Sequence, residues 1–228
     1  MLEPHFARPL AEDPPGARRA ELSDRLARAP SFEVKLNDAR RFQREEAFRI
    51  GVQVLESTAS AEAAGAAHAD LAEACVAAMA EAALAEVERL YGEPPGQFCV
   101  LALGKFGGRE LAEASDLDIM VVYEAEEAAR QGIATGDFYT RVTQRLISAL
   151  SAPTEEGSLY EIDTKLRPSG SKGPVAVRLS SFERYYAEEA WTWEMQALTR
   201  LRAVAGDAAL GAKAERIARA ALARPRDA

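Results

Sequence analysis

Two aspartates, one residue apart, are the residues of this sequence best suited to chemistry. Asp116 and Asp118 open an apolar run that has the length of a β-strand. Side chains at i and i+2 of a strand point to the same face, with Cα atoms roughly 6–7 Å apart. The two carboxylates can therefore aim at one point, and carboxylates together with phosphate oxygens are the ligands that Mg²⁺ prefers. The alternative interpretation is a charged strand end at the edge of a sheet.

A glycine-rich run, residues 104–109, directly precedes this acidic pair. Its adjacent glycines, Gly107 and Gly108, would let the backbone approach a ligand closely and present N–H groups to phosphate. Lys105 and Arg109 add positive charge in the same run. It is not a Walker A loop, because phenylalanine follows the lysine where that motif needs serine or threonine. An ordinary turn is the alternative, since adjacent glycines are common in turns.

A third carboxylate lies further along, in residues 160–167. If these residues form a strand, alternation places Asp163 and Lys165 on one face and the apolar Ile162 on the other. Asp163 would join the acidic pair if the two strands are neighbours. Arg167, just before a Pro-Ser-Gly turn, could reach phosphate. A solvated strand face is the alternative for each of these residues.

Composition excludes several classes of function. The chain has 228 residues, with 28 Lys+Arg against 36 Asp+Glu, and a formal net charge of −8. A protein that coats nucleic acid or an anionic membrane needs a basic face, so we expect neither as a partner. His5 and His68 are the only histidines. Catalysis by a histidine triad, or at a histidine-rich metal site, is therefore nearly excluded.

The sequence also predicts a cytoplasmic protein. No apolar run approaches the roughly 20 residues that span a bilayer, and residues 1–5 lack the features of a signal peptide. The two cysteines, Cys75 and Cys99, are too few for a disulfide framework and are not at metal-ligand spacing. A reducing compartment fits these observations best.

Proline, glycine and hydrophobic periodicity divide the chain into stretches. Residues 1–34 are proline-rich and loop-like, with a helix expected over 18–28, and residues 35–91 have helical periodicity. A Gly-Glu-Pro-Pro-Gly run then stops the helix, and residues 92–206 alternate short apolar runs with helices. This alternation is typical of an α/β or α+β domain. Residues 207–228 begin a further helical region.

The third stretch contains the elements that must position the acids. We expect strands over residues 98–103, 117–123, 159–166 and 174–179, and helices over 138–150, from the capping pair Ser180 and Glu183 onward, and over 191–204. Trp191 and Trp193 fall on the last helix, where we expect them to pack in the interior rather than stack on adenine.

Together, the first strand, the glycine turn, the acidic pair and the later aspartate resemble the nucleotidyltransferase superfamily related to DNA polymerase β. The resemblance implies an α+β fold, in which a mixed sheet with helices follows a helical N-terminal region. Members of this superfamily carry three carboxylates on the sheet and use two Mg²⁺ ions.

Three longer runs narrow the resemblance. Residues 103–118, Leu166-Arg167-Pro168-Ser169-Gly170 and Glu189-Ala190-Trp191-Thr192-Trp193-Glu194 closely resemble the glutamine synthetase adenylyltransferase family. Members of that family hold two such domains, of which one transfers AMP from ATP to a tyrosine of glutamine synthetase and the other removes it by phosphorolysis. The last two runs resemble the C-terminal, adenylylating half. The resemblance covers residues 35–226 and is strongest over 98–206.

This resemblance implies roles for the residues already singled out. Asp116, Asp118 and Asp163 would hold Mg²⁺ and carry the catalysis. The residues that would bind the nucleotide are Lys105, Gly107, Gly108, Arg109, Ser115 and Arg167. Arg109 has a competing interpretation, an ion pair with Glu110 or Glu113. Glutamine synthetase and the PII signal protein would be the partners.

Other functions stay open at this stage. The same residues would serve phosphorolytic removal of AMP, a small-molecule nucleotidyltransferase, or an ATP-binding module that is inactive without further chain. The family continues beyond the point where this sequence ends, which is expected of an excised domain. The sequence also departs from the family where Phe106 replaces leucine and where Thr164-Lys165 replaces Met-Arg. The second change keeps one positive charge but loses the bidentate fork of arginine.

Overall fold

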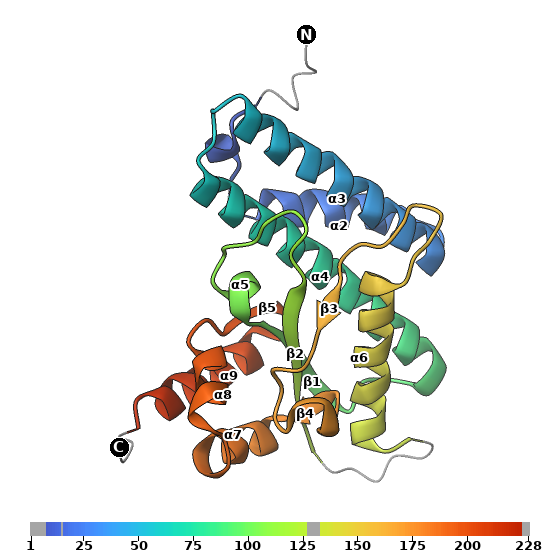
Figure 1. Cartoon of the computed structure of the whole chain (residues 1–228). Helices are drawn as coiled ribbons and strands as arrows, with labels where there is room; N and C mark the ends of the chain where they lie inside the picture. Colours follow the sequence, from blue (N-terminus) through green and yellow to red (C-terminus); the bar gives the residue numbers. More distant parts are fainter. Residues whose placement is uncertain (1–7, 15, 127–132, 225–228) are drawn as a thin grey trace.

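Helices and strands follow one another in the order shown in Figure 1, a computed structural model that describes residues 8–14, 16–126 and 133–224. The first part holds the 3₁₀ turn η1 (Leu10–Glu12) and the helices α2 (Ala17–Ala27), α3 (Phe32–Leu55) and α4 (Ala61–Tyr91). The second part runs through β1 (Gly96–Ala102), α5 (Gly104–Gly107), β2 (Leu117–Ala125), α6 (Thr135–Ser151), β3 (Ile162–Asp163), η2 (Gly170–Lys172), β4 (Ala176–Arg178), α7 (Leu179–Glu188), α8 (Thr192–Leu198), β5 (Arg202–Gly206) and α9 (Ala208–Leu222). His5 and the last residues of the predicted 207–228 region lie outside the described residues.

The strands form one mixed sheet in the order β3-β2-β1-β5, and β4 also pairs with β2. β1 is antiparallel to both of its neighbours, β2 and β5. β3 and β4 are parallel to β2 and share the same side of it, β3 beside its first residues and β4 beside residues 121–123. The expectation of an α+β fold with a mixed sheet is confirmed.

Both faces of the central strands are buried, which explains their continuous apolar sequences. Phe98, Val100 and Ala102 of β1 belong to a core that also includes side chains of α4 and α6. The alternate residues of β1, such as Cys99 and Leu101, belong to a second core with side chains of α7, α8 and α9. In Figure 1 the sheet accordingly stands between α4 and α6 on one side and α7 to α9 on the other.

Helix α4 joins the helical part to the sheet. Ser60 caps its N-terminus by accepting a hydrogen bond from the Ala63 N–H, and Gly92 ends it with a φ of 83°. Its buried alanines and Met79 fill the core, because small side chains let neighbouring elements approach closely. α2 and α3 pack on α4 rather than on the sheet (Figure 1). α4 also contacts α5, α6 and β5, so it connects the helical part with the strands.

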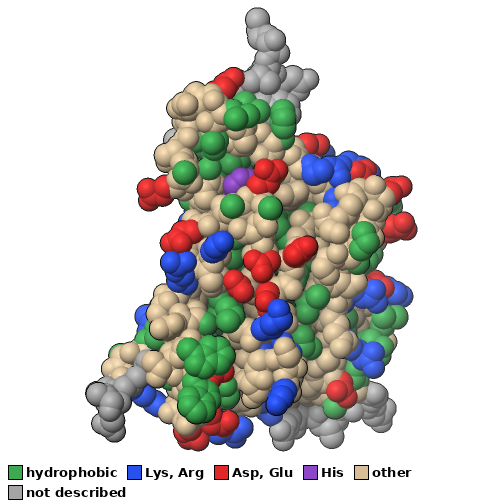
Figure 2. Space-filling model, viewed as in Figure 1, with side chains coloured by type: hydrophobic (Ala, Val, Ile, Leu, Met, Phe, Trp, Pro, Cys, Tyr) green, Lys and Arg blue, Asp and Glu red, His purple; other side chains and the backbone are tan. Residues whose placement is uncertain are grey.

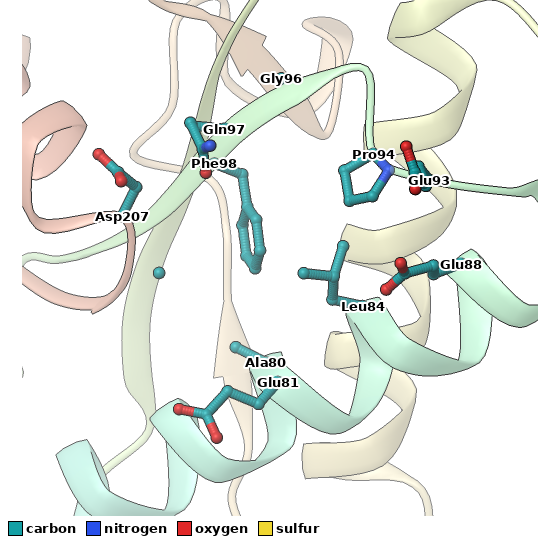
Figure 3. Close-up of a pocket in the computed structure, with 11 residues that line it drawn as sticks. Ala80, Glu81, Leu84, Glu88, Glu93, Pro94, Gly96, Gln97, Phe98 and Asp207 are labelled. Carbon is teal, nitrogen blue, oxygen red and sulfur yellow. The ribbon is translucent and has the colours of Figure 1, made fainter.

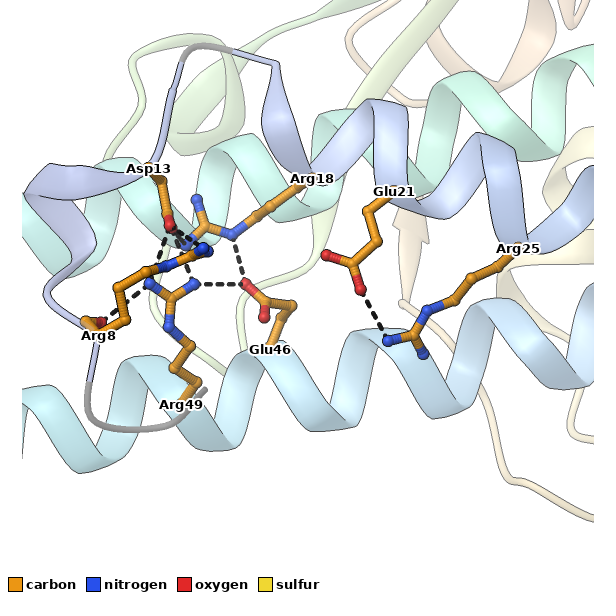
Figure 4. A network of polar contacts seen from close by, with 7 residues as sticks. All are labelled: Arg8, Asp13, Arg18, Glu21, Arg25, Glu46 and Arg49. Carbon is orange, nitrogen blue, oxygen red and sulfur yellow. Dashed lines mark hydrogen bonds and ion pairs between the residues drawn. The ribbon is translucent and has the colours of Figure 1, made fainter. Parts of the chain in front are cut away.

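A buried ion cluster fixes η1 and α2 against α3 (Figure 4). Arg49 has 1% of its side chain exposed and contacts both Asp13 and Glu46, at 2.9 and 3.3 Å. Arg18 contacts the same two carboxylates, each at 2.8 Å. Burial would raise the pKa of Asp13, but the hydrogen bond from Arg49 and the nearby arginine charges outweigh it and lower the pKa. The cluster satisfies charges that would be costly to bury alone.

A second buried arginine ties α3 to the end of α6. Arg40 has 1% of its surface exposed and donates to the carbonyl oxygens of Ala152 and Gly157, both at 2.6 Å. It also donates to Leu36 and Ala149. Arg40 and Arg49 of α3 are therefore both structural donors inside the fold.

Several predicted elements are confirmed and three are wrong in detail. The helix expected over 191–204 ends at Leu198, and residues 202–206 instead form β5, because they pair with the free edge of β1. The strand expected over 159–166 is only β3, since the backbone N–H of Lys165 turns back to the side chain of Asp163 at 2.7 Å. Helix α7 begins at Leu179 with no side-chain cap, so the predicted capping pair does not form.

Two expectations from composition can also be compared with the structure. Cys75 and Cys99 are free and buried, and burial raises the pKa of each thiol to about 12. Neither cysteine is therefore ionised at neutral pH. In the described part of the chain, no helix is long and apolar enough to cross a membrane.

The ion cluster makes a prediction about pH. We expect Asp13→Asn to destabilise the protein at pH 7 by about 3 kcal/mol, because it leaves buried Arg49 with one fewer counter-charge. The lowered pKa of Asp13 stabilises the fold above its unfolded value of 3.8 and stops doing so as the pH falls through the folded value. The difference in unfolding free energy between the two proteins should therefore shrink between about pH 5 and pH 2 in urea titrations. Asp24→Asn, at an exposed aspartate of α2, is the control, and an equal effect of both variants would contradict the prediction.

Candidate active site

The sheet brings two of the three predicted acids together. β2 and β3 pair in parallel over two residues, Leu117 with Ile162 and Asp118 with Asp163. Leu117 is buried, so Asp118 points to the other face of the strand. Asp116 stands one residue before β2 and is exposed. Acidic side chains gather on the face of the molecule shown in Figure 2, over the region where α5, β2 and β3 meet in Figure 1.

The carboxylates of this acidic site, Asp116, Asp118 and Asp163, differ in their electrostatic environment. Burial raises the pKa of Asp118 above its ordinary value, and the charges of Asp116 and Asp163 raise it further. Lys105 and Lys165 oppose this shift without cancelling it. The raised pKa means that the negative charge at Asp118 is only partly compensated, which favours a cation at this point.

Asp163 is compensated by the residue that ends its strand. Lys165 donates its backbone N–H to one oxygen of Asp163 at 2.7 Å and its ammonium group to the other at 3.1 Å. Burial would raise the pKa of Asp163, but these hydrogen bonds and the charge of Arg167 outweigh it and lower the pKa. The Lys165 side chain is 74% exposed, so this ion pair is a surface contact that opens at little cost.

Helix α5 lies directly over the acidic site. The backbone N–H of Leu103 donates to the carbonyl oxygen of Asp118 at 2.9 Å, so the start of α5 is tied to β2. Gly104 has a φ of 53°, and a Cβ there would overlap Oδ2 of Asp118. Only glycine leaves this carboxylate its position. Sequence reasoning singled out Gly107 and Gly108 and missed Gly104.

Gly107 and Gly108 serve the fold in a way that sequence alone did not show. Their N–H groups donate within the α5 turn, to the carbonyl oxygens of Leu103 at 2.7 Å and Gly104 at 3.1 Å. A Cβ at Gly107 would overlap the carbonyl oxygen of Arg200. The backbone donors predicted to cradle phosphate are therefore occupied, and the glycines let the segment before β5 pack against α5.

The three cationic candidates, Lys105, Arg109 and Arg167, differ in their contacts. Lys105 is exposed on α5, and its positive charge partly opposes the rise in the pKa of Asp118. Arg167 is buried and donates to the carbonyl oxygens of Thr164 and Pro174, at 2.7 and 3.1 Å, so it holds the loop after β3. Arg109 pairs with Asp70 of α4 at 2.7 Å rather than with either of the acidic neighbours considered from sequence.

The contact between Arg109 and Asp70 corrects the competing interpretation of Arg109 from sequence. The expectation was an ion pair with Glu110 or Glu113, and Glu110 pairs with Arg200 at 2.9 Å instead. Asp70 lies 39 residues before Arg109, and nothing in the local sequence pointed to it. Ser115 closes the turn before Asp116, where its Oγ accepts from the Ala112 N–H at 3.1 Å.

A metal ion would find hard oxygen ligands at the acidic site. Among the described residues, no group of three His, Cys, Asp or Glu side chains is already arranged to hold a metal ion. The charge of Asp118 is only partly compensated, and Asp163 is paired opposite it in the sheet. These two carboxylates nevertheless suit a divalent cation that prefers carboxylate oxygens. Rotation of Asp163 away from Lys165 would be required to complete such a site.

The two tryptophans lie outside the core. Trp191 is 71% exposed and Trp193 is 64% exposed, so the expectation that they pack in the interior is wrong. Glu194 accounts for their placement, because it accepts from the backbone N–H of Trp191 at 2.8 Å and from the hydroxyl of Tyr185 at 2.6 Å. These contacts fix the start of α8 without burying either indole.

A cavity of about 510 Å³ opens at the other end of β1 (Figure 3). Phe98, Leu84 and Pro94 line it together with acidic side chains such as Glu81 and Glu88. β1 runs from this cavity to Ala102, two residues before α5 begins, so the cavity and the acidic site lie at opposite ends of the same strand. It therefore adds no residue to the acidic site.

Alanine substitutions at Gly104 and Gly107 distinguish two roles of these glycines. Gly104 leaves room for the Asp118 carboxylate, and Gly107 lets the segment before β5 pack against α5. We expect Gly107→Ala to lower the unfolding free energy by about 1–3 kcal/mol more than Gly92→Ala, because its Cβ meets backbone that cannot yield. Gly104→Ala meets the movable end of Asp118 and should cost about as much as Gly92→Ala, the control with a positive φ and open space. Urea unfolding measures all three, and equal values for Gly107→Ala and Gly92→Ala would contradict the packing role.

The chain is similar to one protein family and to several named bacterial proteins. The family described as glutamate-ammonia ligase adenylyltransferase matches residues 4–217. A protein of Caulobacter vibrioides named bifunctional glutamine synthetase adenylyltransferase/adenylyl-removing enzyme is 53% identical over 200 residues, which are 86% of this chain and 20% of the relative. Proteins of the same name from Agrobacterium fabrum and Xanthobacter autotrophicus are 44% and 40% identical, over 89% and 100% of this chain and 21% and 24% of the relatives.

The chain thus spans about a fifth to a quarter of the length of these relatives. The acidic site lies inside the matched residues. The extent of the family match, together with identities of 40% or more, decides the assignment. The chain belongs to the glutamate-ammonia ligase adenylyltransferase family.

Proposed function

We propose that this chain transfers AMP from ATP to a tyrosine hydroxyl of glutamine synthetase in a Mg²⁺-dependent reaction. The observation that carries the proposal is the parallel register that sets Asp118 opposite Asp163 beneath the glycine turn. The relatives' names supply the group transferred and the protein that receives it. The signal protein PII as a further partner is a prediction carried by the family resemblance, and a cytoplasmic location is a prediction carried by the composition.

Asp116, Asp118 and Asp163 are the proposed ligands of Mg²⁺. The ion would supply charge neutralisation on the triphosphate and stabilise the attacking and leaving oxygens of the displacement. Asp118 is held between α5 and β3 and is the fixed member of the set. Burial, together with repulsion from Asp116 and Asp163, raises its pKa, and a bound cation would offset this cost of folding.

The reaction forms a bond between the tyrosine oxygen and the α-phosphorus and breaks the bond from that phosphorus to pyrophosphate. A tyrosine with an ordinary pKa near 10 is mostly protonated at neutral pH, so its proton must pass to a base or to solvent as the oxygen attacks. Asp163 has a lowered pKa and is a weak base by itself. Its proposed part is therefore to orient the hydroxyl rather than to remove the proton alone.

Lys105 and Ser115 are the proposed phosphate contacts among the residues singled out from sequence. Lys105 is exposed on α5 above Asp118, and Ser115 precedes Asp116. The first N–H groups of a helix lack intrahelical acceptors, so the start of α5 replaces Gly107 and Gly108 as the proposed backbone donor. Arg167, which holds its own loop, would act on phosphate through its charge rather than by contact.

Phosphorolytic removal of AMP is the second candidate, because the relatives' names include an adenylyl-removing activity. The same acidic site would serve it, with phosphate as the nucleophile. The resemblance of residues 166–170 and 189–194 to the adenylylating half favours transfer. Supplying AMP-modified glutamine synthetase with phosphate and measuring ADP separates the two directions. A third outcome, binding of ATP with neither reaction, would identify a module that needs further chain.

The proposal predicts that single acids are essential. We expect Asp116→Asn and Asp118→Asn each to lower incorporation of AMP from α-labelled ATP into glutamine synthetase by at least about a hundredfold. The unfolding free energy of Asp118→Asn should not fall, because the change removes repulsion among carboxylates. Asp24→Asn is the control for handling, and a chelator is the control for metal. Full labelling by either site variant would exclude the acidic site from the reaction.

A further inference from the structure

The loop between α5 and β2, residues 108–116, decides where Asp116 stands. The N–H of Glu110 donates to the carbonyl oxygen of Lys105 at 2.9 Å, and the N–H of Ser115 donates to that of Ala112 at 3.0 Å. The first bond joins the loop to α5 and the second folds it on itself, but neither attaches it to the sheet. What holds the loop in place must therefore come from side chains and from packing.

Arg109 is the strained residue of this loop. Its φ is 61°, in the left-handed region that glycine, asparagine and aspartate adopt more readily than arginine. Such a conformation persists only where surrounding contacts impose it. Arg109 donates through both terminal nitrogens to the carboxylate of Asp70, at 2.7 and 2.9 Å, and a bidentate pair of this kind fixes direction as well as distance.

Further contacts join the same loop to α4 and to the segment before β5. A Cβ at Gly65 of α4 would stand 3.5 Å from the carbonyl oxygen of Leu111, whose side chain is buried. Glu110 pairs with Arg200 at 2.9 Å. α4 is thus the surface on which the loop rests, and Asp70 is its charged contact.

The ion pair is too exposed to matter much for overall stability. The side chains of Asp70 and Arg109 are each 42% exposed, and pairs of this exposure contribute little to the unfolding free energy. A loss of function without a loss of stability would therefore report on the position of the loop. This separates a positioning role from a purely structural one.

We propose that Asp70 is a positioning residue for the acidic site, because it holds Arg109 and through it the loop that places Asp116 beside Asp118. The inference rests on the proposed function for its effect on catalysis. Arg109 then acts as a structural clamp and not as a contact to the triphosphate. The helical part of the chain thus reaches the site through this ion pair as well as through the packing of α4 against the loop.

A charge swap tests the proposal. We expect Asp70→Asn and Arg109→Asp each to lower kcat for AMP transfer about tenfold with the KM for ATP nearly unchanged. The double variant Asp70→Arg with Arg109→Asp should recover to within about threefold of the parent protein, since the pair is restored with reversed charges. Aspartate also tolerates the backbone conformation of residue 109.

Two results would overturn the proposal. If Arg109 bound phosphate directly, Asp70→Asn would leave transfer intact and the swap would not rescue Arg109→Asp. If the pair were an idle surface contact, neither single variant would change kcat. Glu86→Gln is the matched control, because Glu86 pairs with Arg89 on the same helix α4 at 2.8 Å.

Hydrogen exchange without nucleotide or metal gives a readout that does not depend on the reaction. The N–H groups of Glu110, Ala112 and Ser115 should exchange faster in Asp70→Asn, return to the parent rate in the swap, and stay unchanged in Glu86→Gln. If the parent chain transfers no AMP, these rates still test the clamp. If the parent transfers AMP and the loop rates do not respond to Asp70→Asn, the clamp fails while the proposed function stands.

Discussion

The site depends on two residues of β2 that pair with two residues of β3. This pairing sets two carboxylates side by side, although their mutual repulsion opposes it. Leu117, fully buried beneath Asp118, belongs to the core that anchors the strand, so apolar packing holds the acids together. A site whose charges repel one another is prepared for a cation, because binding removes a cost that folding has already imposed. At Asp118, the clustering of carboxylates that favours binding of a cation therefore lowers the stability of the fold without the cation.

The helical part supplies the rigidity that such a site needs. Buried arginines, rather than apolar side chains alone, attach its outer helices: Arg49 joins η1 and α2 to α3, and Arg40 joins α3 to the end of α6. Because both are almost inaccessible and each donates to several acceptors, they specify one arrangement of helices. α4 then transmits that arrangement to the sheet and to the loop before Asp116. The helices are thus part of the site's architecture.

Sequence reasoning was strongest where one local pattern decided the structure. The apolar runs of β1 and β2 and the long helical periodicities needed no tertiary information, and all four elements formed. It was weakest where partners came from far along the chain. β5 forms because β1 offers a free edge, and Arg109 meets Asp70 of helix α4. Gly107 was identified as important, but its reason, the carbonyl oxygen of Arg200, is 93 residues away.

The departure at Thr164-Lys165 gains a physical meaning from the structure. The hydroxyl of Thr164 accepts from Arg167 at 2.9 Å, a side-chain bond added to those that Arg167 makes to the carbonyl oxygens of Thr164 and Pro174 in the loop after β3. Lys165 neutralises Asp163 through one flexible, exposed ammonium group, whereas an arginine would hold the carboxylate through a planar fork. A carboxylate held by a single exposed lysine is easier to release to another cation. Lys165 can therefore give up its contact with Asp163 when a metal ion binds. The proposed function requires Asp163 to be released in this way.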